Sequence, residues 1–113
     1  MHHRIPVALA AGALAFAALA HSAFAQNVTG NAEAGKSKNS MCTGCHGIPG
    51  YRTAYPEVYH VPKIGGQQPA YIVAALKEYK SGARWHPSMR GIAASLSEQD
   101  MADLAAYYGG SGK

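Results

Sequence analysis

The chain has 113 residues, with ten lysines and arginines against six acidic residues and a formal net charge of +4. The basic residues are scattered and form no dense run, which argues against a nucleic-acid-binding protein. Only two cysteines occur, which excludes a competing disulfide framework. A chain this short forms one small domain with a limited core, and such domains commonly need a metal or a cofactor for stability.

The first 25 residues have the three parts of a secretory signal peptide. Residues 1–4 are a short basic start, residues 5–20 are an apolar run, and residues 23–25 have the small-x-small pattern of a cleavage site. A membrane-spanning anchor is the alternative, but the apolar run is short and Gly12 interrupts it. We therefore expect this leader to be removed and residues 26–113 to form a single domain.

A first helix is expected to begin after Asn31 and to end near Ser40. Asn31 suits the N-cap position, and Glu33 places a negative charge in the first turn. Gly35 lies inside this helix, where glycine costs about 1 kcal/mol relative to alanine. It marks either a tolerated weak point or a place where another helix crosses at close range.

The sequence CTGCH at residues 42–46 follows this helix and has the attachment pattern of c-type haem. Residues three apart share a face of a helical turn, so the Cys42 and Cys45 thiols can reach the two vinyl edges of one porphyrin. His46 then projects toward the ring centre, where its imidazole can bind iron. The motif predicts one covalent haem c. Because such haems are attached outside the bacterial cytoplasm, it also predicts a location in the periplasm of a Gram-negative bacterium.

Residues 47–68 show no hydrophobic period and contain three prolines, so we expect irregular chain. So long a loop is unusual in a compact domain, but its side chains can pack on a haem. Residues 51–60 are rich in tyrosine, which indicates either ordinary packing of amphipathic rings or a cover or docking patch at a haem edge. No strand pair is evident, and the domain is predicted to be all-α.

The middle helix is the most clearly marked one. It is predicted to begin at Pro69, which suits the first helical position, and to end at Gly82. Its apolar stripe has helical spacing and consists of Tyr71, Ile72, Ala75, Leu76 and Tyr79.

The last helix is predicted to open with Ser97 as its N-cap. Asp100 stands three residues later, in the position of a capping-box acid. An apolar stripe follows and consists of Met101, Leu104, Ala105 and Tyr108.

A second iron ligand must come from the other face of the ring. Met41 is next to the first haem cysteine and cannot cross the ring, and Met101 belongs to the last apolar stripe. Met89 lies in an expected loop among polar residues, where a methionine is not needed for core packing. This position favours Met89 as the second iron ligand. His86 on the same loop is its rival, and His60 is a third candidate. A thioether would raise the redox potential and a second imidazole would lower it.

Together these motifs resemble the class I c-type cytochromes. The likeness is greatest to one half of the dihaem cytochrome c4 type and to the small single-haem cytochromes related to it, and it covers nearly the whole chain after the leader. It implies an all-α cytochrome c fold wrapped around one haem. The features that carry it are Gly35, residues 42–47, residues 62–67 (PKIGGQ), Tyr71, Gly82, Arg84, Met89, residues 96–100 (LSEQD) and residues 104–108 (LAAYY).

The resemblance also implies roles for residues that the motifs alone do not assign. The Pro62 carbonyl would accept the second ring N–H of His46 and so orient it. Gly35 would meet Tyr107 where the first and last helices cross. Met89 would be the sixth iron ligand.

Four further residues would complete the haem pocket. Ile64 would press on a haem face, Tyr71 would line the pocket, and Arg84 together with Trp85 would lie near a propionate. One departure from the dihaem type is plain, since only one haem motif occurs. If this chain is half of such an architecture, the other half is missing or lies on another chain.

Three functional hypotheses follow. The first is a diffusible one-electron carrier and not an enzyme, a monomer or weak dimer that docks through an exposed haem edge onto redox partners such as a membrane-bound oxidase or dehydrogenase. The second is a cytochrome subunit of a larger oxidoreductase. The third, a thiol–disulfide oxidoreductase using Cys42 and Cys45, would require a βαβ pattern beside them, and none is visible.

Overall fold

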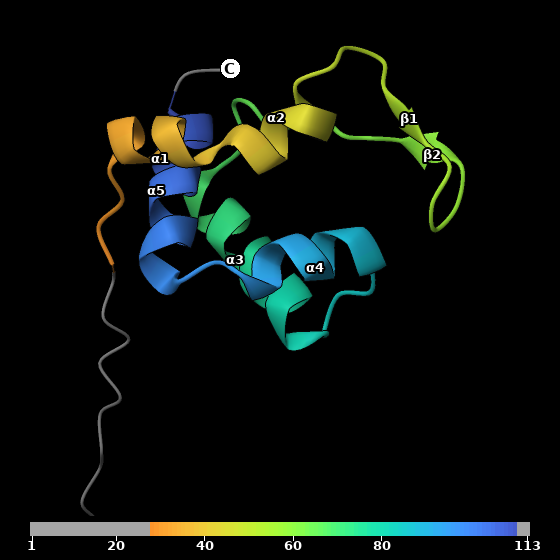
Figure 1. Ribbon diagram of the computed structural model, residues 1–113. Coiled ribbons are helices and arrows are strands. Elements are labelled where there is room, and N and C mark those ends of the chain that lie inside the picture. The colour runs from red at the N-terminus through yellow and green to blue at the C-terminus, as the bar shows by residue number, and fades with distance from the viewer. Residues whose placement is uncertain (1–27, 111–113) are drawn as a thin grey trace, which may run out of the picture.

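The computed structural model describes residues 28–110, so the predicted leader lies outside the described residues. None of the helices within this range is long and apolar enough to cross a bilayer. Within it the chain forms five helices and one pair of very short strands (Figure 1). In chain order these are α1 (Ala32–Lys38), α2 (Ser40–His46), β1 (Arg52–Thr53), β2 (Tyr59–His60), α3 (Pro69–Ser81), α4 (Pro87–Ala94) and α5 (Glu98–Gly109).

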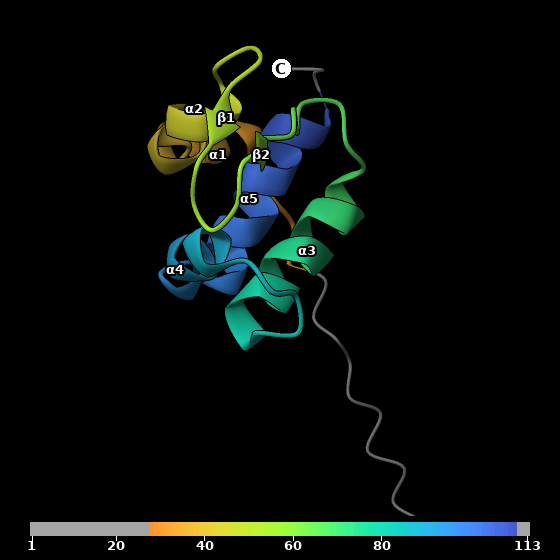
Figure 2. The ribbon, with the colours of Figure 1, turned by 90° about the vertical axis from the view of Figure 1, so that its right-hand side faces the viewer.

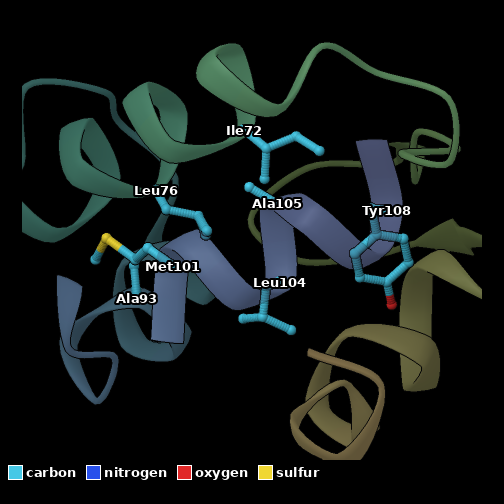
Figure 3. Close-up of a cluster of buried hydrophobic side chains, with 7 residues drawn as sticks. All are labelled: Ile72, Leu76, Ala93, Met101, Leu104, Ala105 and Tyr108. Carbon is cyan, nitrogen blue, oxygen red and sulfur yellow. The ribbon is translucent and has the colours of Figure 1, made fainter. Parts of the chain in front are cut away.

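Helix α5 is the centre of the domain, because α1 and α3 both pack against it and α4 packs on α3. Its predicted apolar stripe is buried, which confirms that Met101 belongs to the core. Figure 3 shows Ala105 of this stripe beside Ile72 of α3, and Met101 beside Ala93 of α4. Leu104 and Tyr108 point away from α3. The buried cluster consists of Ile72, Leu76, Ala93, Met101, Leu104, Ala105 and Tyr108.

Both predicted ends of α3 and the predicted start of α5 are confirmed. Pro69 is the first residue of α3, and Gly82 ends it with a φ of +85°, a left-handed conformation that favours glycine. At the start of α5, the Asp100 N–H donates to Ser97 Oγ at 3.1 Å and the Ser97 N–H donates to an Asp100 carboxylate oxygen at 2.9 Å. This reciprocal pair is a capping box.

Gly35 lies where α1 crosses α5 at close range, as the second of its two interpretations predicted. A Cβ at this position would lie 2.1 Å from the Asp103 carbonyl oxygen and 2.8 Å from Tyr107 Cβ. Both distances are shorter than van der Waals contact, so only glycine allows this crossing.

The first helix is shorter than predicted. It ends at Lys38, and a separate helix, α2, begins at Ser40 and carries the whole haem motif. Asn39 between them has a φ of −83° and a ψ of 0°, and its carbonyl accepts the N–H groups of Cys42 and Thr43. Asparagine and serine are weak helix formers, which explains a break at this point.

Two elements contradict the sequence predictions. The expected loop around Met89 is in fact helix α4, because Pro87 occupies its first position and His86 caps it. The segment predicted to lack strands contains the antiparallel pair β1–β2, in which Arg52 is opposite His60 and Thr53 is opposite Tyr59. Figure 2 shows this hairpin reaching from the level of α2 toward α4. Strands of two residues are too short to leave a period in the sequence.

Candidate cofactor site

A cavity of about 660 Å³ lies among α2, α3, α4, α5, the hairpin and the segment that follows the hairpin. This volume is typical of sites for small molecules and cofactors. The walls are mainly apolar, with a few polar groups at defined places. The structure brings together in these walls all nine predicted site residues, namely Cys42, Cys45, His46, Pro62, Ile64, Tyr71, Arg84, Trp85 and Met89.

Helix α2 places three of these residues on one side of the cavity. Cys42 is half-buried and Cys45 is exposed, and neither forms a disulfide. His46 Nδ1 lies 2.6 Å from the carbonyl oxygen of Pro62. Since a carbonyl only accepts, Nδ1 must carry the ring proton, and Nε2 keeps a free lone pair. This is the contact that the family resemblance implied, and it leaves His46 in the tautomer that a metal ligand needs.

One polar group of the cavity wall is the hydroxyl of Tyr108 on α5. It is buried and has no hydrogen-bond partner among residues 28–110, and Figure 3 shows it directed away from Ile72 and Leu76. Burial raises the pKa of Tyr108 and also that of the Cys42 thiol, which lies beside this hydroxyl. A buried hydroxyl without a partner is costly, so this atom fits a cavity whose occupant supplies the missing contact.

Met89 of α4 and His86, the N-cap of this helix, line the same cavity. Figures 1 and 2 show α4 across the domain from α2. Met89 is half-buried and packs against the edge of the core cluster. The other ligand candidates are placed less suitably. Met101 is 1% exposed inside the core, Met41 is 54% exposed on the α2 side, and His60 is exposed on β2 outside the cavity lining.

His86 is engaged in a different way from His46. Its Nδ1 accepts the backbone N–H of Met89 at 3.2 Å. Because an amide N–H only donates, Nδ1 carries no proton, and the neutral ring then has its proton on Nε2. An imidazole in this state has no free nitrogen lone pair to offer a metal.

A cationic group lies at the mouth of the cavity. Arg84 Nη2 donates to the Tyr71 hydroxyl at 2.9 Å, and the guanidinium carbon lies 5.6 Å and 5.3 Å from the ring centroids of Tyr71 and Tyr79. The hydrogen bond to Tyr71 raises the pKa of Arg84. Trp85 beside it is 71% exposed. A guanidinium held in this way is a suitable partner for a carboxylate.

The residues present fit a haem. The walls combine two thiols at the attachment spacing, an imidazole with a free Nε2, a thioether on the facing helix, an arginine at the mouth and an unsatisfied hydroxyl. Ile92 and Tyr108 also line the cavity, and the sequence did not assign them to the site. Tyr59 lies in the tyrosine-rich residues 51–60, for which a cover at a haem edge was one of two interpretations. Ile92 follows Met89 by three residues, and that helical spacing could have revealed both α4 and this lining residue.

Comparison with known proteins adds an independent finding. Residues 32–108 match the family model of cytochrome c. The chain is 37% identical over 95 residues to cytochrome c4 of Pseudomonas aeruginosa, an alignment that covers 84% of this chain and 42% of the relative. It is 38% identical over 82 residues to cytochrome c-554(548) of Halomonas halodenitrificans, covering 70% of this chain and 94% of the relative. The chain therefore spans less than half of the cytochrome c4 relative but nearly all of the shorter one.

Two further similarities concern a solved structure and an enzyme subunit. The crystal structure of reduced recombinant cytochrome c4 from Pseudomonas stutzeri superposes with a TM-score of 0.53 at 31% identity, covering 74% of this chain and 52% of that chain. The cytochrome subunit of sulfide dehydrogenase from Chlorobaculum tepidum is 31% identical over 75 residues, covering 66% of this chain and 64% of the subunit.

Proposed function

The chain belongs to the cytochrome c family, and from this premise we propose that it is a periplasmic one-electron carrier with one haem c attached through Cys42 and Cys45. Family membership confirms the predicted fold class, apart from the small strand pair. It also gives the general functions of haem binding and electron transport.

The observation that carries the proposal is the contrast between two histidines at one cavity. His46 donates through Nδ1 and keeps Nε2 free, whereas His86 accepts through Nδ1 and has no free lone pair. The imidazole that can bind iron is thus the one beside the two cysteines. The side chain left to bind iron from α4 is the thioether of Met89.

The chemistry follows from these assignments. When bound, the haem supplies an Fe(II)/Fe(III) couple. His46, oriented by Pro62, and Met89 would both hold the iron, which would leave no coordination site for a substrate. A thioether favours the reduced iron and raises the potential relative to a second imidazole. The protein would therefore transfer electrons without being an enzyme itself.

The remaining pocket residues would hold the edges of the haem. Ile64 offers an apolar contact within the cavity, and Arg84, fixed by Tyr71, offers charged donors to a propionate. Trp85 is largely exposed at the mouth, where a redox partner would approach the haem edge. We propose that this mouth is the docking site of partner proteins, and that the carrier is a monomer or a weak dimer.

A second candidate function is a cytochrome subunit of a larger oxidoreductase. The similarity to the cytochrome subunit of sulfide dehydrogenase favours it. So does the exposure of large apolar side chains, because Tyr55, Val58 and Trp85 are 63%, 67% and 71% exposed. Cys42 and Cys45 lie on α2 beside His46 in a cytochrome c domain, which argues against a thiol–disulfide oxidoreductase.

Intact-mass analysis of periplasmic protein, combined with a pyridine haemochrome spectrum, tests the proposal. We expect the mass of residues 26–113 plus one haem, and the spectrum of a haem with both vinyl groups converted to thioethers. A Cys42→Ala variant should keep one thioether at most and shift that spectrum. A bare polypeptide mass would contradict the proposal, whereas co-purification with a larger enzyme would favour the subunit.

A further inference from the structure

We propose that His86 is a positioning residue for Met89: by capping α4 it fixes the direction from which the methionine thioether enters the cavity. The inference rests on the proposed function, in which Met89 is the second axial ligand. It gives His86 a role different from that of iron ligand, which its sequence position suggested.

The first turn of α4 is closed by His86 through two separate hydrogen bonds. Its backbone carbonyl accepts the Arg90 N–H at 2.8 Å, and its Nδ1 accepts the Met89 N–H at 3.2 Å. Pro87 at the first position has no N–H to satisfy. The residue that receives the side-chain cap is therefore the residue proposed to bind iron, and the cap acts directly on the backbone of Met89.

The imidazole that makes this cap is held in place by two tyrosines from other elements. Tyr59 of β2 contacts it edge-on at a centroid distance of 5.5 Å and an interplanar angle of 81°. Tyr79 of α3 contacts it in the same manner at 6.2 Å and 80°. All three rings line the cavity, and Figure 2 shows the hairpin reaching toward α4. The ring thus links the hairpin, α3 and α4 at one point.

This linkage explains why a histidine serves as the cap. Asparagine, aspartate, serine and threonine are the usual N-caps, and they reach the helix with short side chains. His86 reaches it with a rigid ring that also packs between Tyr59 and Tyr79. The orientation of the first turn of α4, and with it the start of the Met89 side chain, is therefore set by the hairpin and by α3 as well as by α4 itself.

Two substitutions distinguish the effect of the hydrogen-bond acceptor of His86 from the effect of its ring. His86→Phe keeps an aromatic ring between Tyr59 and Tyr79 but removes the acceptor, and its ring should preserve the fold. His86→Asn keeps a cap acceptor but removes the ring. His60→Ala is the matched histidine control, since His60 is exposed and does not line the cavity. The readout is the apparent dissociation constant of imidazole for the oxidised, haem-loaded protein, which measures how readily the methionine is displaced.

We expect His86→Phe to tighten imidazole binding about fivefold, which corresponds to about 1 kcal/mol, the typical effect of losing an N-cap. His86→Asn should give a smaller shift of up to about twofold, because the cap acceptor remains while the ring contacts with Tyr59 and Tyr79 are lost. His60→Ala should be unchanged. An unchanged affinity in His86→Phe would overturn the proposal, and so would an equal shift in His86→Asn, because the acceptor would then be irrelevant.

A parallel Met89→Ala variant distinguishes a failure of this inference from a failure of the proposed function. It should bind imidazole without competition from the thioether, and far more tightly than any His86 variant. If Met89→Ala behaves like the wild type, Met89 is not the ligand and the proposed axial ligation fails. If Met89→Ala shifts while His86→Phe does not, Met89 is the ligand and His86 does not position it.

Discussion

At the crossing of α1 and α5, protein atoms contact one another directly, whereas side chains of α2, α3, α4 and α5 line a cavity. At the crossing, Asp103 is 2% exposed, and its carboxylate accepts from the Asn31 N–H, Lys38 Nζ and Gln99 Nε2. In the cavity wall, the buried Tyr108 hydroxyl has no partner among the described residues. The buried carboxylate at the crossing has its hydrogen-bond partners within the protein. The buried hydroxyl in the cavity wall does not, which suits a cavity that binds another molecule.

This difference shows how a small domain divides its residues between stability and function. At the crossing, a substitution can add an atom or remove a charge. Both kinds of substitution should lower the free energy of unfolding. In the cavity wall, a substitution can remove a single polar atom. Its effect on the free energy of unfolding should depend on the bound haem.

The largest effect is expected from Gly35→Ala at the crossing. Its Cβ would lie 2.1 Å from the Asp103 carbonyl oxygen, which is backbone and cannot move aside without shifting α5. We expect a loss of about 3 kcal/mol in the free energy of unfolding, measured with urea. Gly91→Ala in α4 is the matched control, because its Cβ meets nothing within 4 Å. It should be neutral or stabilising by up to about 1 kcal/mol.

A smaller effect is expected from Asp103→Asn, and it should depend on pH. Hydrogen bonds, above all from Lys38, lower the pKa of Asp103, and Lys38 likewise lowers that of Asp100. A carboxylate with a lowered pKa stabilises the fold above its ordinary pKa of about 3.9, and this stability is lost as pH falls through the folded-state pKa.

At pH 7 the loss in Asp103→Asn should be about 2 kcal/mol in the free energy of unfolding, since a buried acceptor of three donors is weakened. The difference between wild type and variant should shrink as the pH is lowered from 5 toward 2. Urea titrations across that range measure it. A difference that stays constant with pH would show that the ionised form of Asp103 contributes nothing.

The smallest effect is expected from Tyr108→Phe in the cavity wall. If the haem-loaded protein supplies a contact to the hydroxyl, its removal should cost about 1 kcal/mol in the free energy of unfolding. Tyr51→Phe is the control, because Tyr51 lies outside the cavity lining and no described hydrogen bond involves its hydroxyl. A gain in stability for Tyr108→Phe would mean that the hydroxyl stays without a partner when the cavity is filled.

Much of the crossing region could be predicted from the sequence. The α5 stripe and the capping box at Ser97 are local patterns with known structural outcomes. The close approach at Gly35 was one of two interpretations of that glycine, and the family resemblance implied the same contact. The break at Asn39 could not be located, because weak helix formers lower the stability of a helix without fixing where it ends.

The cavity region was predicted less completely. The haem motif defined one wall through its spacing, but Pro87 and Gly91 are loop-forming residues elsewhere, and they concealed the eight-residue helix α4. The role of His86 depends on rings contributed by Tyr59 and Tyr79, which only the folded chain brings together. Long-range contacts of this kind leave no period in a sequence.

The visible spectrum of the oxidised, haem-loaded protein tests the central claim, ligation by His46 and Met89, most directly. A methionine sulfur bound to Fe(III) gives a weak band toward the red end of that spectrum. We predict that the wild type has this band, that Met89→Ala lacks it, and that His86→Asn retains it. A wild type without the band, or a band that survives in Met89→Ala, would contradict the assignment of the second axial ligand.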